Sequence, residues 1–410
     1  MYKKICLSLA LGISMVLFSA PESMALSPET ELLLELLQAK GIITSRESQE
    51  FRRTLAASSS QEINGEEQNH RHSVQGLARR VEKLEDAREE TSQLSERIHF
   101  GGFVEVEFSA AHSENMDGSD DTPSSVTLAA AQLDVDIDIT DNVLGHVAFL
   151  YEDEEDFTVD EGFIAISNGE KPSMLFKAGK MYVPFGRYES HFVTDPATLI
   201  LGETNDGALT AAFANDLFEV SAGVFNGAVD ETGEDDRLDS FVGSIVYAMP
   251  ANKKISVAAG VSYTSNLAAS DTLQDDTSGN GVNSEEIHDL VGGFGAFLSA
   301  SFAERFFMDV EYISALEDFT AGDLAFANSR DLKPSAWNVE LAYALNSQVE
   351  FAARYGGSND FGNVAPEGQY GIALLYSPFE NTSITSEYIY AEFEDSSESN
   401  TGTIQLAIEY

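Results

Sequence analysis

A two-residue alternation of apolar and polar side chains, repeated over most of the chain, constrains the fold more than any other feature. It is clearest in Leu133–Ile139, where leucine, valine and isoleucine alternate with three aspartates. The same pattern recurs in 104–108, 337–343, 349–355 and 370–376. A period of two places successive side chains on opposite faces of a β-strand. One such strand would also suit a soluble sandwich, so the number of strands and their connections must decide.

Short and long connections alternate between successive segments of this pattern. Roughly sixteen segments can be counted, which suits an antiparallel barrel with short turns at one end and long loops at the other. An even number of strands places both ends of the domain on the periplasmic side. We therefore expect an all-β fold, a transmembrane antiparallel outer-membrane β-barrel of about 16 strands over residues 97–410. The long polar loops are expected near 112–124, 226–239, 265–288, 316–334, 356–367 and 394–402.

The last strand supports this expectation. Ile404, Leu406 and Ile408 alternate with polar or small residues, and Tyr410 follows in the same phase. Strands at the C-termini of outer-membrane barrels resemble this one closely, since they alternate and end on an aromatic residue.

The first 25 residues have the composition of a secretory signal. Lys3 and Lys4 precede an apolar run, and the small residues Ser23 and Ala25 at the −3 and −1 positions predict cleavage after Ala25. The chain's one cysteine, Cys6, lies inside this segment. The mature chain is therefore expected to lack disulfide, zinc-thiolate and cysteine-nucleophile chemistry. A short spanning anchor is the alternative, but the apolar run is too short for one.

Residues 26–96 have helical rather than β periodicity. Thr44 and Glu47 have the spacing of a capping box, which predicts a helix running towards Leu55. Apolar residues at heptad spacing over 74–84 fit either a short oligomerising coiled coil or a packed amphipathic helix. We expect 26–96 to be a periplasmic helical and coiled-coil segment that gates, trimerises or tethers the barrel. Two partner hypotheses follow, a homotrimer and a contact with peptidoglycan through residues 26–96.

The charge of the chain limits its partners and predicts its lumen. Acidic residues outnumber basic ones 69 to 23, for a net charge of −46, which argues against nucleic-acid binding. Charges on a lipid face are costly, so the acidic positions of the alternating strands should face the lumen. There they either line a solvated wall or attract cations. The predicted acidic lumen consists of Glu105, Glu107, Asp134, Asp136, Asp138, Asp309, Glu311, Glu340 and Glu350.

One long connection is too apolar for an exposed loop. Residues 188–206 contain Phe192 and the run Leu199–Leu201, so this segment should pack against the rest of the protein. It is the third outward connection, and in porins the third loop commonly folds inward and narrows the channel. We expect such an infolded loop near 186–206. Its constriction residues are expected to be Pro184, Phe185, Gly186, Arg187, Asp195, Pro196, Glu203 and Asp206.

The same connection carries a family resemblance. Gly179 and the following Pro184-Phe185-Gly186 resemble the Gly-x-x-x-x-Pro-Phe-Gly signature of phosphate-selective porins. The continuation through 194–204 is more similar to siderophore porins of the legiobactin-receptor type. The motif match covers only about 178–206. The resemblance implies an outer-membrane porin that takes up iron–siderophore complexes, whereas an acidic lumen repels anions and disfavours phosphate.

Enzymatic chemistry has no signature in the chain. The seven histidines are scattered, and the acidic stretch 230–236 lacks EF-hand spacing. We expect no catalytic residue, no metal site and no cofactor. The leading hypothesis is an outer-membrane channel for a small solute or a ferric siderophore. A general cation-preferring porin and an envelope-tethering structural barrel are the alternatives.

Overall fold

The computed structural model describes one barrel and part of the segment before it. Contacts divide the chain into two compact units, Met1–Glu89 and Glu90–Tyr410. The predicted signal segment and the heptads at 74–84 lie outside the described residues. The structure describes residues 34, 37–38, 40, 43–58, 97–114, 119–153, 156–169, 172–233, 238–250, 254–274, 286–327 and 330–410.

Helix α2 (Ser45–Ser58) belongs to the first unit. The Thr44 N–H donates to Glu47 Oε2 at 2.9 Å, and the Glu47 N–H donates to Thr44 Oγ1 at 3.3 Å. These reciprocal bonds satisfy two N–H groups at the start of the helix, so the predicted capping box is confirmed. Among the described residues, no helix is both long and apolar enough to cross a membrane.

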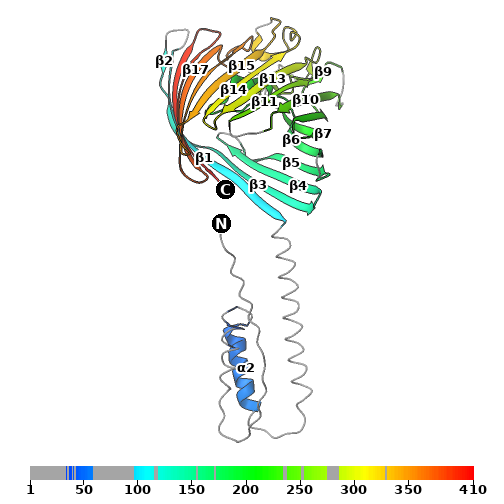
Figure 1. Cartoon of the computed structure of the whole chain (residues 1–410), viewed down its shortest axis with the longest axis vertical. Helices are drawn as coiled ribbons and strands as arrows, with labels where there is room; N and C mark the ends of the chain where they lie inside the picture. Colours follow the sequence, from blue (N-terminus) through cyan, green and yellow to red (C-terminus); the bar gives the residue numbers. More distant parts are fainter. Residues whose placement is uncertain are drawn as a thin grey trace. The chain divides into compact units, whose positions relative to one another are not determined.

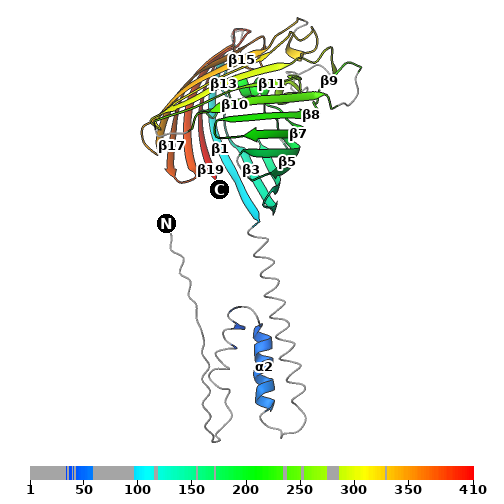
Figure 2. The same cartoon turned by 45° about the vertical axis from the view of Figure 1, so that its right-hand side comes forward.

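The second unit is a closed antiparallel barrel, and the predicted fold class is confirmed. Sixteen long strands make up its wall in the described part of the chain. The first strand closes against the last, from Phe103 opposite Glu409 to Glu114 opposite Glu398, as Figures 1 and 2 show in cyan and red. The wall strands are β1 (Ile98–Glu114), β3 (Ser124–Thr140), β4 (Val143–Glu152), β5 (Thr158–Ser167), β6 (Ser173–Tyr182), β7 (Asn205–Ala214), β8 (Phe218–Phe225), β10 (Ser240–Ala248), β11 (Ile255–Thr264), β13 (Gly293–Phe302), β14 (Phe306–Ala315), β15 (Ser335–Ala344), β16 (Val349–Asn359), β17 (Gly368–Phe379), β18 (Thr382–Glu392) and β19 (Glu398–Glu409).

Short elements lie in the connections. These are β2 (Asp120–Asp121), β9 (Asp230–Glu231), β12 (Glu286–Ile287), α4 (Ala197–Gly202), α5 (Asp271–Gln274) and the 3₁₀ turn η1 (Ala325–Ala327). Strands β9 and β12 pair with each other in parallel. We call the end of the barrel with tight turns, such as 140–142, the turn end, and the opposite end the loop end.

The alternation places apolar side chains outside and polar ones inside. On β15, Leu341 is 56% exposed on the outer face, while neighbouring Glu340 is fully buried inside. The outer face also has aromatic rows at both ends. Phe306 contacts Tyr343 towards the turn end, and Tyr355 contacts Tyr370 towards the loop end. Such rows flank the lipid-facing band of outer-membrane barrels.

The loop end differs from the expected set of solvated polar loops. Strand β1 runs to Glu114 and β3 starts at Ser124, so the first loop is shorter than predicted. Later loops bury apolar side chains in one cluster with Phe185 and Leu201 of the third connection. Apolar residues leave water wherever they can pack together, so these loops fold over one another. Their buried members include Leu267, Leu273, Phe319, Leu324 and Phe361.

Candidate functional site

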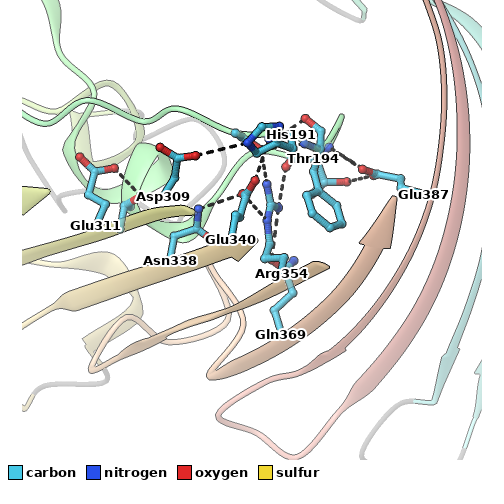
Figure 3. Close-up of polar contacts among 12 residues, drawn as sticks. His191, Thr194, Asp309, Glu311, Asn338, Glu340, Arg354, Gln369 and Glu387 are labelled. Atoms are coloured by element: carbon cyan, nitrogen blue, oxygen red, sulfur yellow. Dashed lines mark hydrogen bonds and ion pairs between the residues drawn. The ribbon is translucent and has the colours of Figure 1, made fainter. Parts of the chain in front are cut away.

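The third connection, residues 183–204 between β6 and β7, lies inside the barrel. We call it the lumen loop (Figure 3). Its apolar residues are buried, with Phe185 at 2% and Leu201 at 0% exposure. Gly186 has φ +74°, and a Cβ there would lie 2.2 Å from the Tyr188 ring. The glycine of the Pro-Phe-Gly motif is therefore needed both for its backbone conformation and for close packing.

Glu311 on β14 binds the first part of the lumen loop. It accepts hydrogen bonds from the N–H groups of Arg187 at 2.7 Å and Tyr188 at 3.1 Å. The Thr198 hydroxyl donates to the same carboxylate at 3.0 Å. A carboxylate can accept several such bonds, and each charge-assisted bond is stronger than a neutral one.

Two further wall carboxylates continue this arrangement. Glu340 on β15 accepts the N–H of His191 at 2.7 Å. Glu387 on β18 accepts the N–H of Val193 at 2.8 Å and the hydroxyl of Thr194 at 2.5 Å. We call Glu311, Glu340 and Glu387 the anchoring carboxylates. They satisfy backbone donors that would otherwise lie buried without a partner.

His191 lies between two more acidic side chains of the wall. Its Nδ1 is 2.8 Å from Glu350 and its Nε2 is 3.3 Å from Asp309. Burial alone would lower the pKa of His191, but the hydrogen bonds to both carboxylates outweigh it and raise the pKa to about 10. The ring is therefore a cation at neutral pH and donates from both nitrogens.

Arg354 on β16 connects the wall to the lumen loop beside Glu340 and His191. Its fully buried guanidinium donates to Glu340 at 2.9 Å, to the Thr194 carbonyl at 2.7 Å and to Ser190 Oγ at 2.6 Å. It also lies 4.4 Å from the centre of the Phe192 ring. Figure 3 shows these contacts converging.

The remaining predicted lumen residues lie further round the wall, on β1 and β3, with β19 between β1 and the strand β18 that carries Glu387. Glu107 accepts a bond from Gln405 at 2.9 Å, Asp134 from Gln132 at 2.8 Å, and Asp136 lies 2.8 Å from His146. Asp138 lies nearer the turn end and contacts His99. None of these partners belongs to the lumen loop. We call the part of the wall that carries Glu105, Glu107, Asp134 and Asp136 the open wall.

Asp195 points from the lumen loop into the remaining space. Its side chain is exposed although Pro196 and Ala197 beside it are buried. Desolvation inside the barrel raises the pKa of Asp195; the charge of Arg354 lowers it, and the charges of Glu107 and Glu387 raise it further. Asp195 also interacts electrostatically with Glu105. The loop and the open wall thus face each other with like charges.

The other predicted loop residues lie nearer the loop end. Burial and the charge of Asp271 raise the pKa of Glu203 to about 8. Asp206 accepts a hydrogen bond from the Gly227 N–H at 2.7 Å, so it holds the following loop in place. Pro184 is half-buried, and Pro196 precedes α4. Arg187 pairs with Glu189 of the same loop at 2.5 Å.

Sequence reasoning missed Glu387 as a site residue, and it considered Arg354 only as one of four basic residues that could form a local basic spot in the lumen. Both stand at inward positions of alternating strands, so the parity that selected Glu340 and Glu350 also applied to them. In the described part of the chain, no group of three or more His, Cys, Asp or Glu has the arrangement of a metal site.

Comparison with known proteins gives relatives without a stated function. No family model matches the chain. A UPF0422 protein of Coxiella burnetii is 25% identical over 277 residues, which cover 65% of this chain and 58% of the relative. A UPF0422 protein of Legionella pneumophila is 27% identical over 260 residues, which cover 57% and 47%. The chain thus spans about half the length of these relatives.

Solved structures of outer-membrane channels share the fold. The channel DcaP of Acinetobacter baumannii superimposes with a TM-score of 0.53 at 13% identity, over 76% of this chain and 97% of that one. An anion-selective porin from Comamonas acidovorans gives 0.51 at 9% identity, over 76% and 99%. OprB of Pseudomonas putida gives 0.53 at 10% identity, over 78% and 96%. At these identities the likeness shows a shared fold and nothing more.

Proposed function

We propose that this chain is a passive outer-membrane channel for small solutes with a preference for cations. The observation that carries the proposal is the pair of acidic surfaces across the remaining lumen, Asp195 on one side and the open wall on the other. Carboxylates in a confined pore raise the local concentration of cations and repel anions. The buried cation Arg354 is already paired with Glu340.

The fold supports the channel part of the proposal. A closed barrel of sixteen strands is wide enough to hold an aqueous lumen. The lumen loop narrows this space by occupying one side of it. Because one porin of the same fold is described as anion-selective, the fold alone does not set the sign of the selectivity. The charges of the lumen must do so.

Planar-bilayer recording tests both parts. Under a KCl gradient the reversal potential should favour K⁺ over Cl⁻, and the preference should weaken as the salt is raised from 0.1 to 1 M. The Debye length falls from about 10 Å to about 3 Å over that range. Absence of single-channel current from correctly folded protein would contradict the channel, and a reversal potential favouring Cl⁻ would contradict the cation preference.

Iron–siderophore uptake is a second candidate, suggested by the resemblance of residues 178–206 to siderophore porins. It is favoured by the use of that motif here, since Phe185 and Gly186 pack the base of the lumen loop. The acidic lumen favours cationic or neutral complexes over anionic ones. Deleting the gene should lower accumulation of a labelled ferric siderophore at low iron, and unchanged accumulation would exclude this role.

We also propose that residues 26–96 lie in the periplasm. The start of β1 pairs with the last part of β3, with Ile98 opposite Ile137. Strand β3 then leads into the tight turn at 140–142. Tight turns of outer-membrane barrels are periplasmic. Protease added to intact cells should leave this segment uncut, and cleavage within it would place it outside. A pull-down with peptidoglycan tests the tethering role, and native mass spectrometry tests the trimer.

A further inference from the structure

The inward carboxylates fall into two sets with different environments. The anchoring carboxylates are buried, with Glu311 at 7%, Glu340 at 0% and Glu387 at 6% exposure. Those of the open wall are only partly buried. A carboxylate that is removed from water and saturated with N–H donors has little remaining capacity to attract a hydrated ion. The two sets should therefore have different roles.

The lumen loop lies directly on the wall that carries the anchoring carboxylates. Phe192 packs against Ala342, Ala352 and Ala373 of strands β15, β16 and β17. The contact is close, because a Cβ on Gly371 would lie 2.6 Å from the Phe192 ring. Small residues on the wall thus make space for one aromatic ring of the loop, and that ring fills it.

Apolar packing continues at the loop end on the same side. One buried cluster joins inward residues of the wall, such as Ile313 on β14 and Ala336 on β15, to Leu201 of the lumen loop and to Leu267 and Phe361 of later loops. A dry, closely packed region of this kind excludes ions. The exposed charges Arg187 and Glu189 on the loop pair with each other.

We propose that solutes pass on one side of the lumen loop only, between Asp195 and the open wall. Asp195, Glu105 and Glu107 then determine charge selectivity. The anchoring carboxylates are positioning residues that hold the loop and do not meet the solute. This inference rests on the proposed channel function and adds the route through the lumen and the residues that select along it.

Thiol modification during bilayer recording tests the route. The chain's only cysteine, Cys6, lies in the predicted signal segment, so single-cysteine variants of the mature barrel are specific. A cationic methanethiosulfonate should lower the current severalfold in Glu107→Cys and Asp195→Cys. It should leave the current of Ala352→Cys unchanged, because that position lies under Phe192. Equal block at Ala352→Cys, or none at Glu107→Cys, would overturn the one-sided route.

Charge removal separates selection from positioning. Glu107→Gln should move the reversal potential towards zero while the conductance in 1 M KCl stays unchanged, since salt screens the charge there. Glu387→Gln should change the conductance and its noise in 1 M KCl, because the loop is loosened, with a smaller effect on the reversal potential. Equal shifts of the reversal potential in both variants would contradict the division. Loss of the channel function itself would appear differently, as no current in the unmodified protein.

Discussion

At the scale of single residues, Arg354 is the most constrained charge of the site. Its guanidinium has no exposed surface and bonds to Glu340, to the Thr194 carbonyl and to Ser190. Replacing one partner of a buried pair leaves the other charge uncompensated, which is much more costly than losing an exposed pair. The residue should therefore matter more for stability than any charge of the open wall.

Arg354→Met should destabilise the barrel by about 3–5 kcal/mol. Unfolding in urea, followed by the mobility shift of the folded barrel in gel electrophoresis, measures this loss. Adding Glu340→Gln to Arg354→Met should restore part of the stability, since the unpaired charge is removed. An undiminished stability of Arg354→Met would show that the pair contributes nothing to the fold.

His191 gives a pH dependence of a defined sign. Its pKa is raised from 6.5 to about 10, so the charged ring stabilises the folded state. This contribution is complete below pH 6.5 and is lost as the pH rises towards 10. The stability difference between the unmodified protein and His191→Gln should therefore be largest near pH 6 and should close by about pH 10. A difference that grows with pH would contradict the assignment.

At the scale of elements, the shape of the lumen loop depends on a glycine at its base. Gly186→Ala places a methyl group against the Tyr188 ring at a positive φ. The loop should shift, and the conductance should become larger and noisier. Gly368→Ala is the matched control, because a Cβ there meets nothing within 4 Å. Equal behaviour of the two variants in bilayer recordings would exclude a special role for Gly186.

For the lumen loop and the strands that hold it, the sequence predicted the direction of the side chains but not their contacts. Strand parity placed Glu311, Glu340 and Glu107 on one face without distinguishing their roles. Their partners decide the roles, and those partners lie far away in the sequence: Arg187 is 124 residues from Glu311. The apolar content of 188–206 predicted a packed loop, but the wall it packs on depends on how the barrel closes. Local patterns carry no information on that contact.

At the scale of the whole molecule, the outer surface is a continuous apolar band between aromatic rows. On β15, Leu341 lies between Trp337 and Tyr343, both on the outer face. Leu341→Arg should destabilise the barrel in lipid by about 2–4 kcal/mol, the usual effect near the bilayer midplane. Leu345→Arg, in the turn beyond Tyr343, should have an effect of about 0–1 kcal/mol. Folding titrations in vesicles compare the two, and equal effects would contradict this placement of the band.

The anchoring carboxylates hold the lumen loop mainly through its main chain, and the hydroxyls of Thr194 and Thr198 are the side-chain donors among these contacts. Each N–H that they bind exists whatever residue stands at that position, proline excepted. Arg187, Val193 and other loop positions can thus be replaced while these bonds persist. A substitution at Asp195 should therefore change the charge that the loop presents to the lumen while the loop stays in place. The residues that hold the loop are thus distinct from those proposed to select the solute. Single substitutions can therefore change the selectivity without loosening the loop.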